Sequence, residues 1–169
     1  MIRTSHALRP SLAIAAVCIA VLPLSGCFSG QQATTTMQAK MNSGNGVQAQ
    51  QGPIRIENAT VVKSADGAEA TLLVRIFNDG IEPDALTYAS INGTPAEIIG
   101  TEEVAVDLPP GSSTSFGWNS DLRIDLGALD AEVATYVPIE LGFATAGLAP
   151  LSVLVVPQAG IYEDVTILP

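Results

Sequence analysis

Short stretches of apolar and β-branched residues, separated by turn residues, fill the chain from Pro53 onward. The alternation is clearest at 137–144 (VPIELGFA), where Val, Ile, Leu and Phe occupy every second position. A period of two predicts a strand that buries one face. Pro138 has no amide hydrogen, so we expect this strand at a sheet edge. Similar stretches predict strands at 54–63, 69–78, 85–91, 113–118, 122–126, 136–144 and 151–156.

Turn chemistry separates these stretches, with Asp-Gly, Asn-Asp-Gly, Asn-Gly and Pro-Pro-Gly runs at 66–67, 78–80, 92–93 and 109–111. No segment after Pro53 sustains an apolar period of 3.6, although 126–134 could form one or two helical turns. About seven short strands in roughly 105 residues predict an all-β fold, an antiparallel two-sheet β-sandwich of immunoglobulin-like type.

The first 26 residues have the pattern of an export signal. Arg3, His6 and Arg9 give a basic start, and an apolar run of about a dozen residues follows at 11–22 (SLAIAAVCIAVL). The run is shorter than the roughly 20 apolar residues that a transmembrane helix needs. It therefore indicates a signal peptide over residues 1–26. A retained anchor helix and a buried core helix are the alternatives.

The sequence Leu24-Ser25-Gly26-Cys27 resembles the bacterial lipobox, in which small residues precede a cysteine that receives a lipid. We expect cleavage before Cys27, with S-diacylglycerol and N-acyl groups on that residue. Two or three acyl chains give stable anchoring, at about 0.8 kcal/mol per buried methylene. The predicted location is the extracytoplasmic face of a bacterial cell membrane, and the predicted partner there is membrane lipid.

Residues 27–52 are rich in Gln, Gly, Ser, Thr and Asn and contain few large apolar residues, so we expect a lipidated flexible linker. The run Thr34 to Thr36 within it is either a glycosylation tract or plain linker. The β-sandwich domain is predicted at 53–157. A C-terminal tail at 158–169 adds an edge strand or stays loose, and its residues leave both outcomes open.

The excess of acidic residues and the lack of histidine exclude several classes of function. After removal of residues 1–26, 5 basic residues face 17 acidic ones, a formal charge of −12. Such a chain repels nucleic acid and anionic headgroups. His6 is the only histidine and the two cysteines are Cys18 and Cys27, so the processed chain would keep no imidazole. Ser112, Ser113 and Ser115 then have no histidine base, and we expect no enzyme, catalytic residue or cofactor.

The order and spacing of four passages resemble the periplasmic copper-chaperone family PCu(A)C, and within it the actinobacterial LpqE-type lipoproteins. The passages are IRIENATVV, ATLLVRIFNDGIEPDALTYAS, VDLPPGSSTSFG and VPIELGFATAGLAPLSVLVVP, which together span 53–157. The resemblance implies a cupredoxin-like β-sandwich. It also implies copper(I) ligands, a His and Met set near 96–106 and a His-x-Met near 121–126.

These copper ligands are absent from the sequence. The first region offers Glu97, Ile98, Glu102 and Glu103, and the second offers Leu122, Arg123 and Ile124. None is the soft thioether or imidazole that copper(I) prefers. Met37 and Met41 in the linker could hold copper(I) weakly, or they are ordinary linker residues. No metal site is therefore predicted in the domain.

Two acidic groups are candidates for binding a hard cation such as Ca²⁺. They are Asp79, Glu82 and Asp84 in one turn, and Glu102, Glu103 and Asp107 in another. Neither matches an EF-hand loop, and both fit solvated turns. Trp118, Tyr88 and Tyr136 are expected in the core or at an interface.

These patterns predict a membrane-anchored extracytoplasmic lipoprotein. Its non-catalytic β-sandwich would act as a binding module for a protein or another component of the cell envelope. A copper-chaperone-like metal carrier is the alternative, and it rests on the family resemblance alone.

Overall fold

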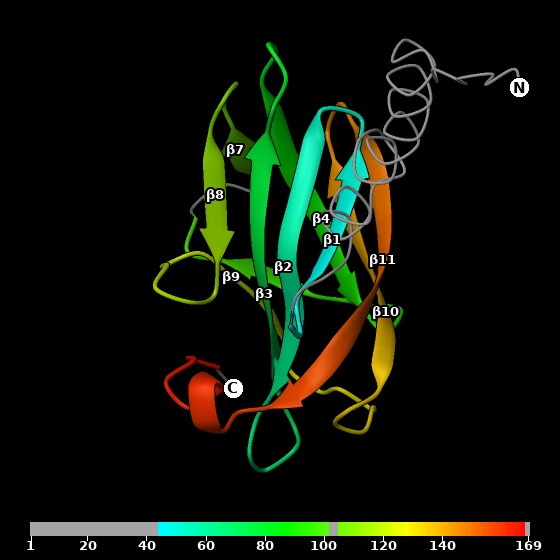
Figure 1. Cartoon of the computed structure of the whole chain (residues 1–169), viewed down its shortest axis with the longest axis vertical. Coiled ribbons are helices and arrows are strands. Elements are labelled where there is room, and N and C mark those ends of the chain that lie inside the picture. The colour runs from blue at the N-terminus through cyan, green and yellow to red at the C-terminus, as the bar shows by residue number, and fades with distance from the viewer. Residues whose placement is uncertain (1–43, 102–104, 168–169) are drawn as a thin grey trace, which may run out of the picture. The chain divides into compact units, whose positions relative to one another are not determined.

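The computed structural model describes residues 44–101 and 105–167, which form an all-β fold (Figure 1). No helix in these residues has the length and apolar character to cross a bilayer. The strands are β1 (Val47–Gln51), β2 (Ile54–Lys63), β3 (Ala70–Asn78), β4 (Asp84–Ile91), β5 (Thr94–Pro95), β6 (Glu97–Ile99), β7 (Val106–Leu108), β8 (Ser113–Phe116), β9 (Arg123–Leu126), β10 (Tyr136–Phe143) and β11 (Gly147–Pro157), and a 3-10 helix follows at Gly160–Tyr162.

The strands form two layers that share one strand, β11. The hydrogen-bonded order is β5-β4-β10-β11-β2-β3-β9-β6, with β1 beside β2, β7 beside β4 and β8 beside β3. Residues 147–154 of β11 pair antiparallel with β10, whereas Val155 to Pro157 pair parallel with β2. Every other pairing is antiparallel. The predicted two-sheet sandwich is confirmed, with one parallel junction that the alternation pattern does not encode.

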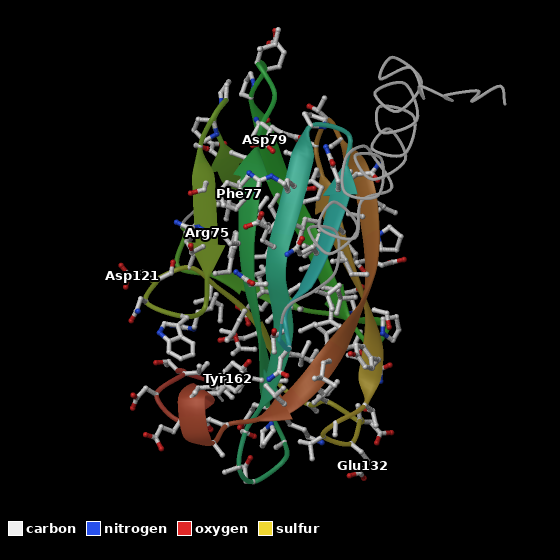
Figure 2. The ribbon with its side chains drawn as sticks, in the orientation of Figure 1. Arg75, Phe77, Asp79, Asp121, Glu132 and Tyr162 are labelled. Carbon is white, nitrogen blue, oxygen red and sulfur yellow. The ribbon has the colours of Figure 1, made fainter. Side chains whose placement is uncertain are left out.

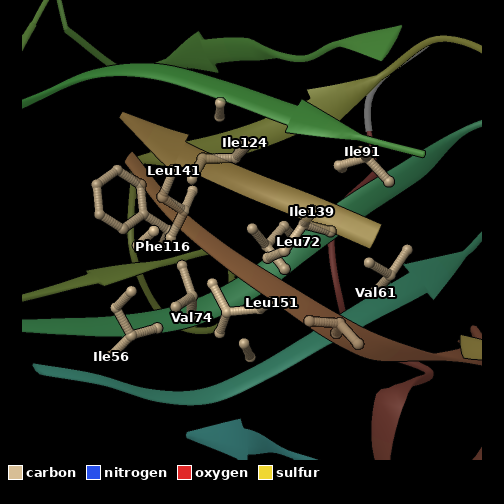
Figure 3. Packing of buried hydrophobic residues seen from close by; sticks show 14 of the residues in the cluster. Ile56, Val61, Leu72, Val74, Ile91, Phe116, Ile124, Ile139, Leu141 and Leu151 are labelled. Atoms are coloured by element: carbon tan, nitrogen blue, oxygen red, sulfur yellow. The ribbon is translucent and has the colours of Figure 1, made fainter. Parts of the chain in front are cut away.

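The main core fills the space between the layers (Figure 3). Ile56, Val61, Leu72 and Val74 come from β2 and β3, and Ile139 comes from the facing layer. All five are at least nine-tenths buried. At roughly 1.5 to 3 kcal/mol for each fully buried aliphatic side chain, this interface is the main source of stability.

A second apolar cluster covers the outer face of the β2–β3 layer. Val62, Leu73, Val156 and Val165 are buried there, and Tyr162 and Ile167 pack against them. Val165 and Tyr162 belong to the C-terminal segment, which the sequence left open between an edge strand and a loose tail. In the structure this segment is neither, because the 3-10 helix and the residues after it pack onto the sheet.

The linker prediction is wrong for Val47–Gln51, which forms β1 and pairs with β2. Only Val47 is a large apolar residue in this strand, so its sequence shows little β pattern. Its backbone pairs with β2, and the side chains of Val47 and Ala49 pack against the main core. The helical option at 126–134 is also wrong, since β9 ends at Leu126 and residues 127–134 form a bend, an irregular stretch and a turn.

The edge prediction for Pro138 is wrong as well, because β10 lies between β4 and β11. The last pair with β4 is Ile139 with Ile91, and the Pro138 carbonyl accepts a hydrogen bond from the amide of Asn92, 2.7 Å away. The nitrogen and the carbonyl of one strand residue point the same way. The Pro138 nitrogen therefore faces the side where β4 has already ended, and no ladder bond is lost.

Candidate functional site

A groove of about 500 Å³ lies on the outer face of the β2–β3 layer. Its floor comes from β2, β3 and β8, and its rim comes from the β8–β9 turn, the residues before β1 and the 3-10 helix. Figure 2 shows Arg75 on this face and Tyr162 toward the C-terminal end of the chain. Five stretches of the sequence therefore build one concave surface.

A β-bulge in β2 shapes one side of the groove. The register with β3 shifts between Glu57 and Thr60, and Asn58 adopts a left-handed backbone with φ 56°. Asparagine tolerates this conformation better than most residues. Gly46 packs against the bulge so closely that a Cβ there would lie 2.6 Å from the Asn58 Cα. Both residues line the groove.

Gly117 sets the position of Trp118. It has φ 86°, and a Cβ on it would lie 2.3 Å from Cδ2 of Leu73. Its amide donates to the Leu122 carbonyl at 2.8 Å, which closes the β8–β9 turn. Only glycine satisfies both the conformation and the contact. The turn leaves the Trp118 side chain at the groove rim, 44% exposed, so of the two expected positions, the core or an interface, the core is wrong.

The C-terminal segment supplies the opposite rim. The ring of Tyr162 meets the ring of Trp118 edge to face, with centroids 6.1 Å apart. The Tyr162 hydroxyl also accepts a hydrogen bond from Nδ2 of Asn45, at 3.1 Å. Ile161 beside it is 70% exposed. The rim thus combines two aromatic rings and an exposed aliphatic side chain, a composition typical of binding sites.

Arg75 brings a positive charge to the groove. It is exposed on β3 and lies opposite Glu57 of β2 and Ser115 of β8. Glu57 pairs instead with Arg55. Within residues 44–101 and 105–167 the guanidinium of Arg75 has no carboxylate partner, and it lies 5.4 Å from the centroid of the Phe77 ring. Its charge is therefore available to the groove.

Arg55, on the same face, is fully engaged. It forms ion pairs with Glu57 and with Asp79, the latter at 2.7 Å between Nε and Oδ2. Its guanidinium also lies 4.0 Å from the centroid of Phe77. The hydrogen bond from Arg55 lowers the pKa of Asp79, and the same bond raises the pKa of Arg55. Figure 2 shows Arg75, Phe77 and Asp79 along this face.

The acidic turn at 79–84 is built by internal hydrogen bonds. Buried Asn78 donates to the carbonyls of Glu82 and Leu108 and accepts from the amide of Gly80, all within 2.9 Å. Asp84 accepts from the amides of Thr145 and Ala146. Since Asp79 pairs with Arg55, two of the three acidic residues considered as cation ligands have other partners. In the second acidic group, Glu102 and Glu103 lie outside the described residues.

The two regions where the family resemblance implies copper ligands lie side by side. β6 pairs with β9, with Glu97 opposite Asp125, Ile98 opposite Ile124 and Ile99 opposite Arg123. Arg123 and Asp125 are two residues apart and form an ion pair at 3.1 Å, with side chains 14% and 7% exposed. Oδ1 of Asp125 is buried and has no hydrogen-bond partner among the described residues.

Comparison with solved structures shows the fold of PCuAC domains. The apo PCuAC domain from PmoF1 matches with a TM-score of 0.55 and 22% identity over 64% of this chain and 97% of its own. The copper-bound PCuAC domain from PmoF2 gives 0.57, 23%, 65% and 97%, and its apo form gives 0.58, 20%, 67% and 97%. The expected resemblance to this family is confirmed at the level of fold. No model of a known family and no curated protein matches the sequence.

The residues that the structure describes do not fit the ion of the copper-bound PmoF2 domain. Residues 44–101 and 105–167 contain no His, Cys or Met, and no group of three or more His, Cys, Asp or Glu gathers there. At β6 and β9 the facing side chains are an ion pair, a second acid and aliphatic residues. A guanidinium there repels a cation, and copper(I) prefers sulfur and imidazole ligands.

The remaining predicted positions lie outside the described residues. These are Cys27 with the signal peptide, the tract Thr34 to Thr36, and the methionines Met37 and Met41. The sequence did not single out Arg75, Asn58 or Tyr162 for the groove. The signal it did contain is a lone Trp118 after a glycine in a turn, a place where a large ring stays at the surface.

Proposed function

We propose that the chain is a lipid-anchored extracytoplasmic protein of the bacterial cell envelope, of LpqE type, whose β domain is a non-catalytic binding module. The observation that carries the binding role is the groove, which has the exposed ring of Trp118 and the half-buried ring of Tyr162 at one end and, at the other, an arginine without a carboxylate partner among the described residues. A concave surface that combines apolar rings with a few polar groups is the usual form of a ligand site. The lipobox sequence at Cys27 supports the anchor.

The anchor is tested by fractionation. Wild-type chain should stay with membranes after a high-salt wash, because acyl chains hold by burial rather than by charge. The Cys27→Ser variant should lose the diacylglycerol mass and leave the washed membrane fraction. Cys18→Ser is the matched control and should behave as wild type. Intact-mass spectra that keep residues 1–26 on the wild-type chain would contradict the anchor.

The groove is tested by site-specific photocrosslinking in intact cells. A photoreactive residue at Ile161, on the groove rim, should give a reproducible adduct with an envelope component. The same residue at Ile81, which is 89% exposed in the β3–β4 loop, is the control and should not give that adduct. Equal adducts from both positions, or none from Ile161, would count against the groove as the binding surface.

A copper carrier is the second candidate, favoured by the fold shared with the copper-bound PmoF2 domain. In this chain the thioethers of Met37 and Met41 would have to be the copper ligands, because the described residues contain no His, Cys or Met. Titration of the processed chain with Cu(I) against a competing chelator decides it. Binding tighter than about 1 µM that is lost in the Met37→Leu/Met41→Leu variant would support a carrier. Weaker binding would exclude it.

A further inference from the structure

Arg75 stands out among the basic residues of the described chain because the others are satisfied internally. Arg55 holds Glu57 and Asp79, Arg123 holds Asp125, and Nζ of Lys63 donates to the Ala131 carbonyl at 2.7 Å. Arg75 has neither a carboxylate nor a carbonyl partner among the residues described. A guanidinium offers five donors in a planar fork that matches a carboxylate or phosphate.

The groove around Arg75 adds neutral hydrogen-bonding groups at the same end. Ser115 of β8 lies directly opposite Arg75. Asn58, at the β2 bulge, also lines the groove. Neither side chain carries a charge that would neutralise the guanidinium. This end of the groove is therefore built to receive an anionic group, although the chain as a whole has a formal charge of −10.

The other end of the groove is apolar. Leu73 forms its floor, and Trp118, Ile161 and Tyr162 form its walls. The exposed fractions of Trp118 and Ile161 are 44% and 70%, so apolar surface on both faces water. A ligand that covered these side chains would gain roughly 25 cal/mol for each Å² of apolar surface removed from water.

We infer that the groove binds a small amphiphilic anion, with its single carboxylate or phosphate on Arg75 and its apolar body against Trp118, Ile161 and Tyr162. The inference rests on the proposed binding module and names its ligand class. The charge complementarity between one available guanidinium and one acidic headgroup selects the anion. The volume of about 500 Å³ is that of a site for a single small molecule.

The test uses the full chain in isolated membranes washed free of ATP, so that no probe is esterified enzymatically. The probe is a ten-carbon carboxylic acid with a terminal diazirine and an alkyne tag. After irradiation, labelled peptides are mapped by mass spectrometry. We expect adducts on the peptides that contain Trp118 and Ile161. Decanoate and decyl phosphate, one with each headgroup, are added separately as competitors of the probe. The one that reduces labelling at the lower concentration identifies the preferred headgroup.

Arg75→Gln should reduce labelling of these peptides by about tenfold, because it removes the charge-assisted hydrogen bonds to the headgroup. Arg75→Lys should retain most of the labelling. Lys63→Gln is the control at another basic residue of the β2–β3 layer, and its labelling should stay within about twofold of wild type, since Lys63 does not line the groove and its Nζ donates to the Ala131 carbonyl. Thermal unfolding of each variant verifies that the domain is folded.

Two outcomes separate the ligand class from the binding role. If Arg75→Gln and wild type label equally while Trp118→Leu reduces labelling, the anionic headgroup is refuted and the groove remains a binding surface. If no probe labels the groove and the photoreactive residue at Ile161 also yields no adduct, the proposed binding module fails together with its ligand.

Discussion

The indole ring of Trp118 meets the phenol ring of Tyr162 edge to face, with the ring planes inclined at 69°. The first ring comes from the β8–β9 turn and the second from the 3-10 helix at the end of the chain. Edge-to-face pairs contribute about 0.5 to 1.5 kcal/mol beyond their buried area. The contact therefore reports whether the C-terminal segment is docked on the sheet.

Replacement of Tyr162 by alanine should release this segment. We expect a loss of about 2 to 3 kcal/mol in the free energy of unfolding, because the ring contact and part of the apolar cover over Leu73 are lost. Trp118 is the only tryptophan, so its emission should shift to longer wavelength. Tyr162→Phe, which loses only the hydrogen bond from Asn45, should keep the emission of wild type. An unchanged spectrum in Tyr162→Ala would contradict the contact.

Gly117→Ala should destabilise the β8–β9 turn. The new Cβ would meet Leu73 and would also have to adopt a positive φ. We expect a loss of about 2 to 4 kcal/mol, measured by denaturant unfolding. Gly93→Ala is the matched control, because Gly93 has φ 77° and a Cβ added to it would meet no heavy atom within 4 Å. It should lose only about 1 to 2 kcal/mol. Equal losses would mean that the contact with Leu73 is unimportant.

The pair formed by Arg123 and Asp125 should be strongly coupled. Asp125→Leu alone leaves a guanidinium that is 14% exposed without its carboxylate, and we expect a loss of about 2 to 4 kcal/mol. Arg123→Met alone leaves the buried carboxylate of Asp125 without its cation, and the loss in the free energy of unfolding should be at least as large. The double variant should recover most of the loss, since both charges are then absent. Additive losses in this double-mutant cycle would refute the coupling.

The ion pair between Arg55 and Asp79 predicts a dependence on pH. Arg55 holds the pKa of Asp79 below the ordinary value of 3.8 in the folded chain. A carboxyl with a lowered pKa stabilises the fold at pH above its unfolded value, and this contribution is lost as the pH falls through the folded value. Asp79→Asn should therefore be less stable than wild type near neutral pH.

The difference between Asp79→Asn and wild type should shrink as the pH falls through the lowered pKa of Asp79 and vanish in more acidic solution, where this carboxyl is protonated. It should also shrink in about 1 M salt, since both side chains are exposed to solvent. Asp130→Asn, a change at an exposed loop residue, is the control. Urea unfolding at a series of pH values measures all three chains. A difference independent of pH would contradict the ion pair.

The long strands could be predicted from the sequence because burial sets their pattern. The alternation in 54–63 gives the bounds of β2 directly, and 136–144 gives β10 within one residue. β1 has one large apolar residue and β6 is only three residues long, so neither shows a pattern and only their partners β2 and β9 reveal them. Pairing with a distant strand is a tertiary property, which local periodicity does not contain.

The groove could not be predicted from the sequence for the same reason. Arg75 resembles any polar residue on the exposed face of a strand. In the described part of the chain its guanidinium lacks a carboxylate partner because Glu57, which lies opposite it, forms an ion pair with Arg55. Tyr162 lies in a short segment whose docking depends on Val62, Leu73 and Val156. The absence of soft ligands in the domain, by contrast, is a property of composition, and the sequence alone predicts it.

The two layers of the sandwich have a strand in common, since β11 pairs with β10 along most of its length and with β2 at its end. Neither layer can separate from the other unless β11 loses its backbone hydrogen bonds to β10 or to β2. Local opening of one layer would therefore spread to the second, and the amide hydrogens of both should exchange with solvent through one shared unfolding event.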